Sequence, residues 1–571
     1  MGGNPLHCHP YFPNHQTDTM KPVIYQIFTR LFGNRNTALK SDGNIDENGC
    51  GKMNSIDDNT LVRIRQLGVT HIWYTGIIRH ATTTDYSKFG IPTQNHLVVK
   101  GKAGSPYAIT DYYDVDPDLA EDVERRMEEF QQLVERTHNA GMKVIIDFVP
   151  NHVAREYHSV CKPETVADLG ENDDKNMHFS IKNNFYYCWG LPLDISNLPQ
   201  KKGEEYHEMP AKATGNDHFD NKPGANDWYE TVKLNYGIDY CDAGGKSEHF
   251  NPIPDTWGKM TGILLFWASK GIDAFRCDMA EMVPAAFWHW ATDKVKYAYP
   301  NVKFIGEVYD PSQYRNYINA GFDMLYDKVG MYDCIRDVIC FNRCTADITR
   351  QWQANDDILN HMLYFLENHD EQRIASDFFA GDATKGIPGM AVSAWLNASP
   401  VMVYAGQEFG EKGMDEEGFS GKDGRTTIFD YWALGTLQRG YYNRRRMKAG
   451  EREINGIYTK ILTLANKEDA LREGTFYDLM YVNPQMSQRQ FAFMRKYGRQ
   501  LVIVVANFDG KEVACNVNIP QHAFDYWQME EGQFEASDLL DGEKIKINLS
   551  ANDTADINVP AYGIRAYKII L

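Results

Sequence analysis

The stretch IDAFRCDMAE, residues 272–281, decides how the rest of the chain is interpreted. It begins as a short apolar run typical of a buried strand. Arg276 and Asp278 then stand two residues apart, so both side chains leave one face of an extended segment. A carboxylate beside a guanidinium stays ionised at neutral pH, which is the state a carboxylate nucleophile needs. A structural Arg–Asp ion pair explains the same pattern, and the remaining sequence has to decide between the two.

Strand-like runs alternate with helical segments on both sides of this stretch. Helices are predicted over 55–68, with Ser55 as N-cap and Gly68 as terminator, and over 120–141. The eight strand candidates are VIYQIFTRLF (23–32), HIWYTGII (71–78), VIIDFVP (144–150), IDAFRCD (272–278), KFIGEVY (303–309), MLYDKVG (324–330), LYFLENHD (363–370) and PVMVYAGQ (400–407). Eight strands alternating with helices predict an α/β fold, the (β/α)8 TIM barrel, whose active site lies at the C-terminal ends of the strands.

Two regions depart from this alternation. Residues 153–250 carry loop signals, aromatics and charges with little periodicity, and they predict an inserted subdomain after the third strand. Beyond 470 the chain changes to short alternating strands separated by turns, which predicts a C-terminal antiparallel β-sandwich domain. The expected divisions are a loose N-terminal tail (1–19), the catalytic barrel (20–152 and 251–470), the inserted subdomain (153–250) and the C-terminal domain (471–571).

Composition and charge exclude several classes of partner. The 78 acidic residues outweigh 59 basic ones, and the resulting net charge of −19 disfavours nucleic acid and anionic membranes as partners. The sequence has no 18-residue apolar run that would predict a transmembrane helix. These features leave a globular protein, and its oligomeric state stays open.

Cysteine usage and the first residues bear on the compartment. Ten cysteines contain no C-x-x-C pair, so we expect neither a zinc site nor a disulfide framework, but free thiols in a reducing compartment. Residues 1–19 lack the apolar middle of a signal peptide. We therefore expect a cytoplasmic protein. A periplasmic or secreted location stays open, because a signal peptide that had been removed would leave no trace.

Polar side chains follow four of the predicted strands. These are Asp147 with Asn151 and His152, Arg276 with Asp278, Glu307, and His369 with Asp370. A cap, an ion pair or a calcium ligand would explain each of them singly. Together, at one barrel mouth, three or more carboxylates would repel one another unless the protein used them. Glycoside cleavage is the chemistry that needs paired carboxyl groups, one ionised and one protonated.

Four segments of the sequence resemble those of a known family. DFVPNH (147–152), DAFRCD (273–278), GEVYD (306–310) and ENHD (367–370) are similar in order and spacing to the signature segments of the alpha-amylase superfamily of glycoside hydrolases. SPYAITDYYDVDPDL (105–119) resembles the family's segment before the third strand, and VPAYGIRAYKI (559–569) resembles its terminal β-domain. The similarity runs from about Lys21 to the C-terminus.

The resemblance implies a catalytic role for three carboxyl groups. Asp278 would be the nucleophile that forms a covalent glycosyl-enzyme intermediate. Glu307 would protonate the leaving oxygen as general acid and then activate water as general base. Asp370 would stabilise the distorted sugar by binding its ring hydroxyls. The enzyme would retain the anomeric configuration, which requires the two key carboxyls about 5–5.5 Å apart.

Five further residues take substrate-binding roles by the same resemblance. Arg276 would keep Asp278 ionised, and His152 and His369 would donate hydrogen bonds to hydroxyls of the sugar at the cleavage point. Tyr107 matches the family's stacking aromatic residue, and Asp147 matches an orienting carboxylate.

The sequence departs from the family pattern at two places. Glu281 and Met282 stand where many amylases carry Lys and His, which questions ordinary endo-amylase binding of the leaving chain. TVKLN (231–235) best matches the fifth short motif, and Lys233 then replaces an Asp of calcium-dependent members. An ammonium substitutes for a metal ion electrostatically, so we expect no required cofactor and doubt the structural calcium, although Asn151 remains a candidate ligand. An alignment through LPLDISN (191–197) would instead supply Asp194.

Three functions remain in competition at this stage. The first is a retaining hydrolase of α-glucosidic bonds in starch, glycogen or maltooligosaccharides. The second uses the same machinery as a transglycosylase or an α-1,6-specific enzyme, and differs in which hydroxyl attacks. The third is a non-catalytic carbohydrate-binding or scaffold relative, which predicts the loss of at least one of Asp278, Glu307 and Asp370. All three carboxylates are present.

Overall fold

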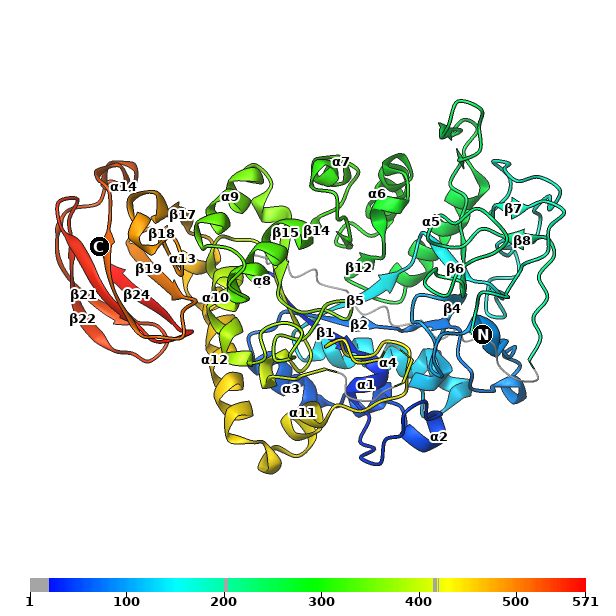
Figure 1. The fold of residues 1–571 in the computed structure, drawn as a ribbon, viewed down its shortest axis with the longest axis horizontal. Coiled ribbons are helices and arrows are strands. Elements are labelled where there is room, and N and C mark those ends of the chain that lie inside the picture. The colour runs from blue at the N-terminus through cyan, green and yellow to red at the C-terminus, as the bar shows by residue number, and fades with distance from the viewer. Residues whose placement is uncertain (1–19, 200–203, 414–417, 420) are drawn as a thin grey trace, which may run out of the picture.

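A closed barrel of eight parallel strands forms the centre of the molecule (Figure 1). The computed structural model describes residues 20–199, 204–413, 418–419 and 421–571. The barrel strands are β1 (Val23–Phe28), β2 (His71–Thr75), β5 (Lys143–Phe148), β12 (Ala274–Cys277), β13 (Lys303–Gly306), β14 (Met324–Tyr326), β15 (Met362–Phe365) and β16 (Val401–Tyr404). They close in the order β1-β16-β15-β14-β13-β12-β5-β2, so the predicted (β/α)8 barrel is confirmed. The predicted N-terminal tail lies outside the described residues.

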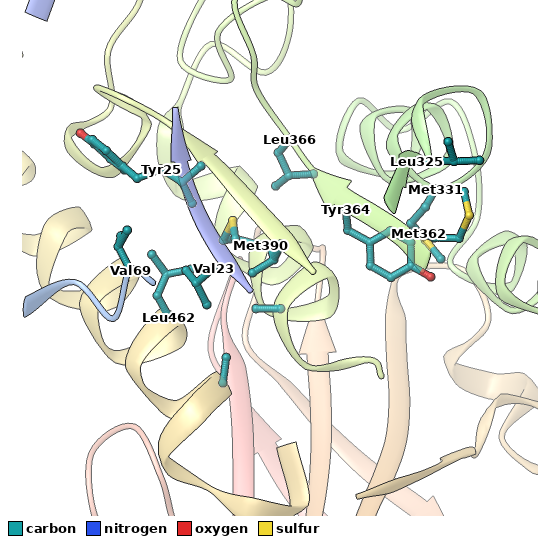
Figure 2. Close-up of a cluster of buried hydrophobic side chains, with 14 of the residues drawn as sticks. Val23, Tyr25, Val69, Leu325, Met331, Met362, Tyr364, Leu366, Met390 and Leu462 are labelled. Carbon is teal, nitrogen blue, oxygen red and sulfur yellow. The ribbon is translucent and has the colours of Figure 1, made fainter. Parts of the chain in front are cut away.

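The two-residue period of the strands creates two apolar layers. In β1, Ile24 belongs to a buried cluster to which all eight strands contribute, and this cluster fills the barrel interior. Val23 and Tyr25 point the other way, into a much larger cluster between the barrel and its helices. Figure 2 shows part of this outer layer, including Met390 and Leu462. The barrel is therefore a packed core, and its chemistry is confined to the rim.

Helices surround the barrel (Figure 1). They are α3 (Asp58–Gln66), α4 (Arg126–Asn139), α5 (Asp255–Ala268), α6 (Ala285–Ala298), α7 (Tyr314–Asn319), α8 (Asp333–Ile339), α9 (Ala346–Ala354), α10 (Ile387–Trp395) and α12 (Ala449–Lys467).

The first predicted helix has a different N-terminus from the expected one. The expectation that Ser55 caps it is wrong, because Ser55 lies in a preceding 3₁₀ turn and the Asp57 side chain accepts the Thr60 backbone N–H at 2.8 Å. Gly68 does follow the helix, with φ of +94°. A β-carbon there would stand 2.7 Å from the Leu462 backbone, so glycine serves both the turn and the approach of α12.

The segment between β5 and β12 is built from short antiparallel strand pairs. They are β6 (His152–Ala154) with β9 (Thr231–Lys233), β7 (Tyr187–Cys188) with β8 (Ala211–Lys212), and β10 (Ile238–Asp239) with β11 (Ser247–Glu248). A further pair, β3 (Ile78–His80) with β4 (Ile109–Val115), follows β2. The β6–β9 pair places His152 opposite Lys233, which brings this segment to the rim of the barrel. The domain limits drawn from the sequence remain predictions.

The C-terminal region is antiparallel β structure, as predicted. One sheet has the order β17-β18-β19-β24-β21-β22, formed by β17 (Thr475–Asp478), β18 (Gln490–Tyr497), β19 (Gln500–Asn507), β21 (Gly532–Asp538), β22 (Lys544–Leu549) and β24 (Ile564–Ile570). A second sheet pairs β20 (Val513–Asn518) with β23 (Thr554–Val559). Both sheets lie at one end of the molecule, beside the barrel (Figure 1). Within the described ranges, no helix is both long and apolar enough to span a membrane.

Candidate active site

The register of three neighbouring strands places the predicted carboxylates side by side. Arg276 of β12 pairs with Asp147 of β5, and Cys277 pairs with Gly306 of β13. Asp278 and Glu307 are the next residues along their strands, so both leave the C-terminal rim at the same level. The strand pairing thus brings together side chains that lie 131 to 160 positions apart from Asp147 in the sequence.

The Arg276 guanidinium joins these carboxylates. Its side chain is fully buried, and its Nη1 lies 2.8 Å from Asp278 Oδ1 and 3.3 Å from Asp147 Oδ1. Its Nη2 lies 2.7 Å from Glu307 Oε1, and its Nε donates to the Tyr326 hydroxyl at 3.3 Å. Because one planar guanidinium binds both Asp278 and Glu307, it fixes their spacing and neutralises part of their repulsion.

Glu307 is bound by one ion-pair partner, Arg276, and by two hydrogen-bond donors. Besides Arg276, the Tyr309 hydroxyl donates to Oε1 at 2.7 Å and the Met279 backbone N–H donates to Oε2 at 2.8 Å. Met279 follows Asp278 directly and has a left-handed conformation with φ of +42°. This turn aims its N–H at the neighbouring strand end, so the loop after β12 helps to orient Glu307.

Burial opposes the ionisation of Asp278. The residue is 5% exposed, and burial raises the pKa of its carboxyl well above the ordinary value. The Arg276 guanidinium lowers this pKa, whereas the charges of Glu307 and Asp370 raise it further. Arg276 alone therefore does not bring this carboxyl to its ordinary pKa, and Asp278 ionises at a higher pH than an exposed aspartate.

Asp370 and His369 belong to one hydrogen-bonded group. His369 Nε2 lies 2.9 Å from Asp370 Oδ2 and 2.5 Å from the Tyr107 hydroxyl, and its Nδ1 lies 2.8 Å from Gln26 Nε2. Burial would raise the pKa of Asp370, but His369 and Arg276 hold it below the usual range. Asp370 therefore stays ionised at the pocket surface, while its neighbours fix its direction.

His152 and Asp147 complete the predicted set. Burial and the nearby ammonium groups of Lys233 and Lys100 lower the pKa of His152 to about 3, so its imidazole is neutral at physiological pH. The His152 ring lies 5.2 Å from the Trp228 ring. Asp147 accepts a hydrogen bond from the Trp73 indole at 3.0 Å and lies beneath the pocket surface.

A pocket of about 330 Å³ opens above these residues. Six of the eight predicted site residues line it, namely Tyr107, His152, Asp278, Glu307, His369 and Asp370. Arg276 and Asp147 lie below and contact this set. The structure thus brings all eight residues to one place at the C-terminal rim, where a TIM barrel carries its active site.

Part of the pocket wall was not predicted from the sequence. Residues 423–429, on the long loop after β16, contribute Asp423, Arg425, Thr426, Thr427 and Phe429, and other loops contribute Lys100, Trp228 and Glu230. The first group lies on the loop that follows the eighth predicted strand, and loops at that end of a barrel strand are expected to line the active site. The second group lies in segments without periodicity, so no local pattern pointed to it.

Arg373 anchors this loop to the barrel. Its fully buried guanidinium donates to Glu367 Oε2 at 2.8 Å, to the Thr426 hydroxyl at 2.8 Å and to the Ala405 carbonyl at 3.0 Å. Its backbone N–H donates to the Gly424 carbonyl at 2.8 Å. One side chain therefore links the ends of β15 and β16 to the wall of the pocket.

The position expected for calcium is taken by the Lys233 side chain. Its Nζ lies 2.5 Å from Asn151 Oδ1, 2.6 Å from Asp217 Oδ1 and 3.4 Å from the Met282 carbonyl oxygen. The residue is 2% exposed, and burial lowers the pKa of the ammonium while Asp217 opposes this. Oxygen atoms suited to calcium already surround a positive charge, so these residues do not fit the metal. Asp194, the alternative ligand, forms an ion pair with Lys222 at 2.8 Å.

The family of this chain follows from a comparison with models of known protein families. The family model for the catalytic domain of alpha-amylase matches residues 26–455. The chain belongs to the alpha-amylase family. This match begins within β1, covers the other seven barrel strands and the inserted segment, and includes every predicted site residue.

Individual relatives within the alpha-amylase family have low sequence identity to this chain, but the matches cover most of both chains. Alpha-amylase 3 of Dictyoglomus thermophilum is 24% identical over 519 residues, covering 87% of this chain and 86% of that protein. A cyclomaltodextrinase of a Bacillus species is 22% identical over 522 residues, covering 86% of this chain and 74% of that protein. The crystal structure of the Geobacillus thermoleovorans alpha-amylase with acarbose matches with a TM-score of 0.64 at 18% identity, covering 96% of this chain and 98% of that one.

Proposed function

We propose that this member of the alpha-amylase family is a retaining hydrolase of α-glucosidic bonds in starch, glycogen or maltooligosaccharides. The observation that carries the proposal is the single buried guanidinium of Arg276, which binds both Asp278 and Glu307 beside an open pocket. Retaining glycosidases need their two key carboxyl groups about 5–5.5 Å apart, and a shared guanidinium holds two carboxylates at short range. Asp370 lines the same pocket.

The two half-reactions use Asp278 and Glu307 in turn. Asp278 attacks the anomeric carbon and forms an ester, while Glu307 transfers its proton to the leaving oxygen and the leaving chain departs. Water then gives its proton to Glu307 and attacks the same carbon, and Asp278 leaves as the carboxylate. Two inversions at one carbon retain the anomeric configuration.

The remaining residues of the pocket bind and orient the sugar. Tyr107 and Gln26 hold His369, which in turn holds Asp370, and both His369 and Asp370 contact sugar hydroxyls as the ring flattens towards the transition state. Neutral His152 also lines the pocket, and the Tyr107 ring supplies an apolar face for the sugar. Asp147 acts through Arg276 and stays below the surface.

Product analysis tests this proposal against its alternatives. Purified protein is incubated with maltoheptaose and, separately, with the branched trisaccharide panose, and products are followed over time by chromatography. Shorter maltooligosaccharides alone support the hydrolase and distinguish internal from terminal cleavage. Products longer than maltoheptaose would replace it with a transglycosylase, and early release of glucose from panose would indicate α-1,6 specificity. The absence of products would favour a non-catalytic carbohydrate-binding or scaffold role.

The proposed enzyme requires no calcium ion. Lys233 supplies a positive charge between Asn151, Asp217 and the Met282 carbonyl, and thereby links the inserted segment to the loop after Asp278. Treatment with a chelator should leave activity unchanged. A loss of activity that added calcium restores would contradict this part of the proposal.

A cytoplasmic location forms the last part of the proposal. Cys161 and Cys241 are free and exposed in the structure, which suits a reducing compartment. Cell fractionation with an antibody tests the location, and recovery of the protein outside the cytoplasmic fraction would contradict it.

A further inference from the structure

The loops after β12 and β13 contact each other at two points. The first is the hydrogen bond from the Met279 N–H to Glu307. The second involves Glu281, whose Oε2 accepts the backbone N–H of Tyr309 at 2.9 Å and that of Asp310 at 3.0 Å. Within the described ranges Glu281 forms no ion pair, so these two amides are the polar partners of its carboxylate. A carboxylate that accepts two successive N–H groups fixes the orientation of both peptide units.

Tyr309 connects this contact to the reacting carboxyl group. Its backbone N–H is held by Glu281, and its hydroxyl donates to Glu307 Oε1 at 2.7 Å. The side chain is partly buried and lines the pocket. Any rotation of the Tyr309 peptide would therefore move the hydroxyl relative to Glu307.

The Tyr309 hydroxyl differs chemically from the other two groups that bind Glu307, the Arg276 guanidinium and the Met279 backbone N–H. A guanidinium and a backbone N–H can only donate, whereas a phenol hydroxyl can donate or accept. Glu307 alternates between a carboxylic acid, which carries a proton to give, and a carboxylate. Tyr309 can hydrogen-bond both forms by turning its hydroxyl, and it therefore has to stay in place throughout the cycle.

We propose that Glu281 is a positioning residue for the acid–base group Glu307 and acts through Tyr309. This inference rests on the proposed function and deepens it. It also gives a role to a residue that departs from the usual family pattern. Glu281 borders an open groove of about 680 Å³ beside the pocket, but its Oε2 is bound to the backbone of the β13 loop.

The alternative is that Glu281 binds the leaving sugar directly. That role predicts weaker substrate binding when the carboxylate is removed, whereas positioning predicts slower proton transfer with binding preserved. The two roles also differ in their dependence on the leaving group, because a fluoride leaving group needs far less protonation than a sugar hydroxyl.

The test measures kcat and KM of Glu281→Ala, Glu281→Gln, Tyr309→Phe and the double variant E281A/Y309F on maltoheptaose and on α-maltosyl fluoride. Glu248→Gln is the matched control, because Glu248 is exposed, lines the same groove and, among the residues that the structure describes, forms no side-chain hydrogen bond or ion pair with either loop. For Glu281→Ala we expect kcat on maltoheptaose to fall about tenfold, a fraction of the roughly 10²–10⁴ that a general acid supplies, with KM within about twofold. Activity on the fluoride should fall less than about threefold.

The remaining variants make the result decisive. Glu281→Gln keeps one acceptor oxygen, so its kcat on maltoheptaose should fall less than that of Glu281→Ala. Tyr309→Phe should likewise lose more activity on maltoheptaose than on the fluoride. The double variant should be no slower than the slower of E281A and Y309F, because both act on the same group. A higher KM with unchanged kcat, equal losses on both substrates, or additive losses would overturn the inference. If the wild-type protein cleaves neither substrate, the proposed function itself fails; if the wild type is active and the variants match Glu248→Gln, only the positioning role fails.

Discussion

Replacement of Lys233 tests the proposal that this side chain, and not a calcium ion, holds the inserted segment. In Lys233→Met, Asn151 Oδ1 and the Asp217 carboxylate lose a donor that lies 2.5 Å and 2.6 Å away. Breaking a fully buried ion pair typically costs about 3–5 kcal/mol. The Asp217 side chain is 36% exposed and stays partly hydrated, so we expect a cost of about 2–3 kcal/mol.

The corresponding shift in melting temperature is small but measurable. An unfolding entropy of about 2.1 cal/mol/K per residue gives about 0.9 kcal/mol/K for a barrel of roughly 450 residues, so Tm should fall by about 2–3 °C. Lys233→Asp tests the electrostatics in the opposite direction. It places a carboxylate beside Asn151, Asp217 and the Met282 carbonyl, and this set of oxygen atoms suits calcium.

Calorimetry or fluorescence melting in calcium and in chelator measures these effects. The wild type and Lys233→Met should melt at the same temperature in both solutions. Lys233→Asp should melt lower than Lys233→Met in chelator, because Asp217 repels the new carboxylate, and calcium at about a hundred times its Kd should restore about 2.7 kcal/mol. A wild-type Tm that falls on chelation and recovers with calcium would show that the wild type is stabilised by calcium and would contradict the proposed role of Lys233. A Lys233→Asp Tm that is the same in calcium and in chelator would also contradict it.

Three further predictions follow from the site. Asp278→Asn should lower kcat on maltoheptaose more than about a thousandfold with an unchanged circular dichroism spectrum, because it removes the nucleophile but little volume; retained turnover would contradict the assignment. The acid limb of the kcat/KM profile should lie above the ordinary aspartate pKa of about 3.9, because burial raises the pKa of Asp278 and activity is lost as pH falls through that raised value. The measurement is kcat/KM in a series of buffers. An acid limb at or below pH 3.9 would contradict the raised pKa of Asp278. Arg373→Met should destabilise the protein by about 3–5 kcal/mol in thermal melts, because it strands the buried Glu367 carboxylate, and a change below 1 kcal/mol would show that the pair is dispensable.

The sequence was sufficient to predict the barrel and to predict that the candidate site residues lie together at its C-terminal rim, while their catalytic and binding roles stay predictions. The barrel strands are short and largely apolar runs, and polar residues follow four of the predicted strands at or near their ends; both signals are local. Arg276, Asp278 and Glu307 could be assigned to one rim because parallel strands end at the same edge. Their exact hydrogen bonds depend on register and rotamer, and those required the structure.

Features that depend on long-range contact could not be predicted in this way. The N-cap of α3 is Asp57 and not Ser55, although both residue types cap helices well, because the chain before Asp57 forms a separate turn. Asp217 pairs with Lys233 from a loop without periodic pattern. Glu281 was recognised as unusual, but its contact with the Tyr309 backbone became visible only when the two loops were placed together.

In the proposed mechanism, Asp278 forms a covalent bond to the sugar, and Glu307 transfers the proton to the leaving oxygen. The most direct test is to slow the second half-reaction with a 5-fluoro-α-glycosyl fluoride and to identify the labelled peptide by mass spectrometry. We expect a label of one glycosyl unit on the peptide that contains Asp278. Asp278→Asn should abolish this label. The label should also disappear when the reagent is removed and the enzyme hydrolyses the intermediate. A label on another carboxylate, or steady turnover of the reagent with inversion of anomeric configuration and no label, would contradict it.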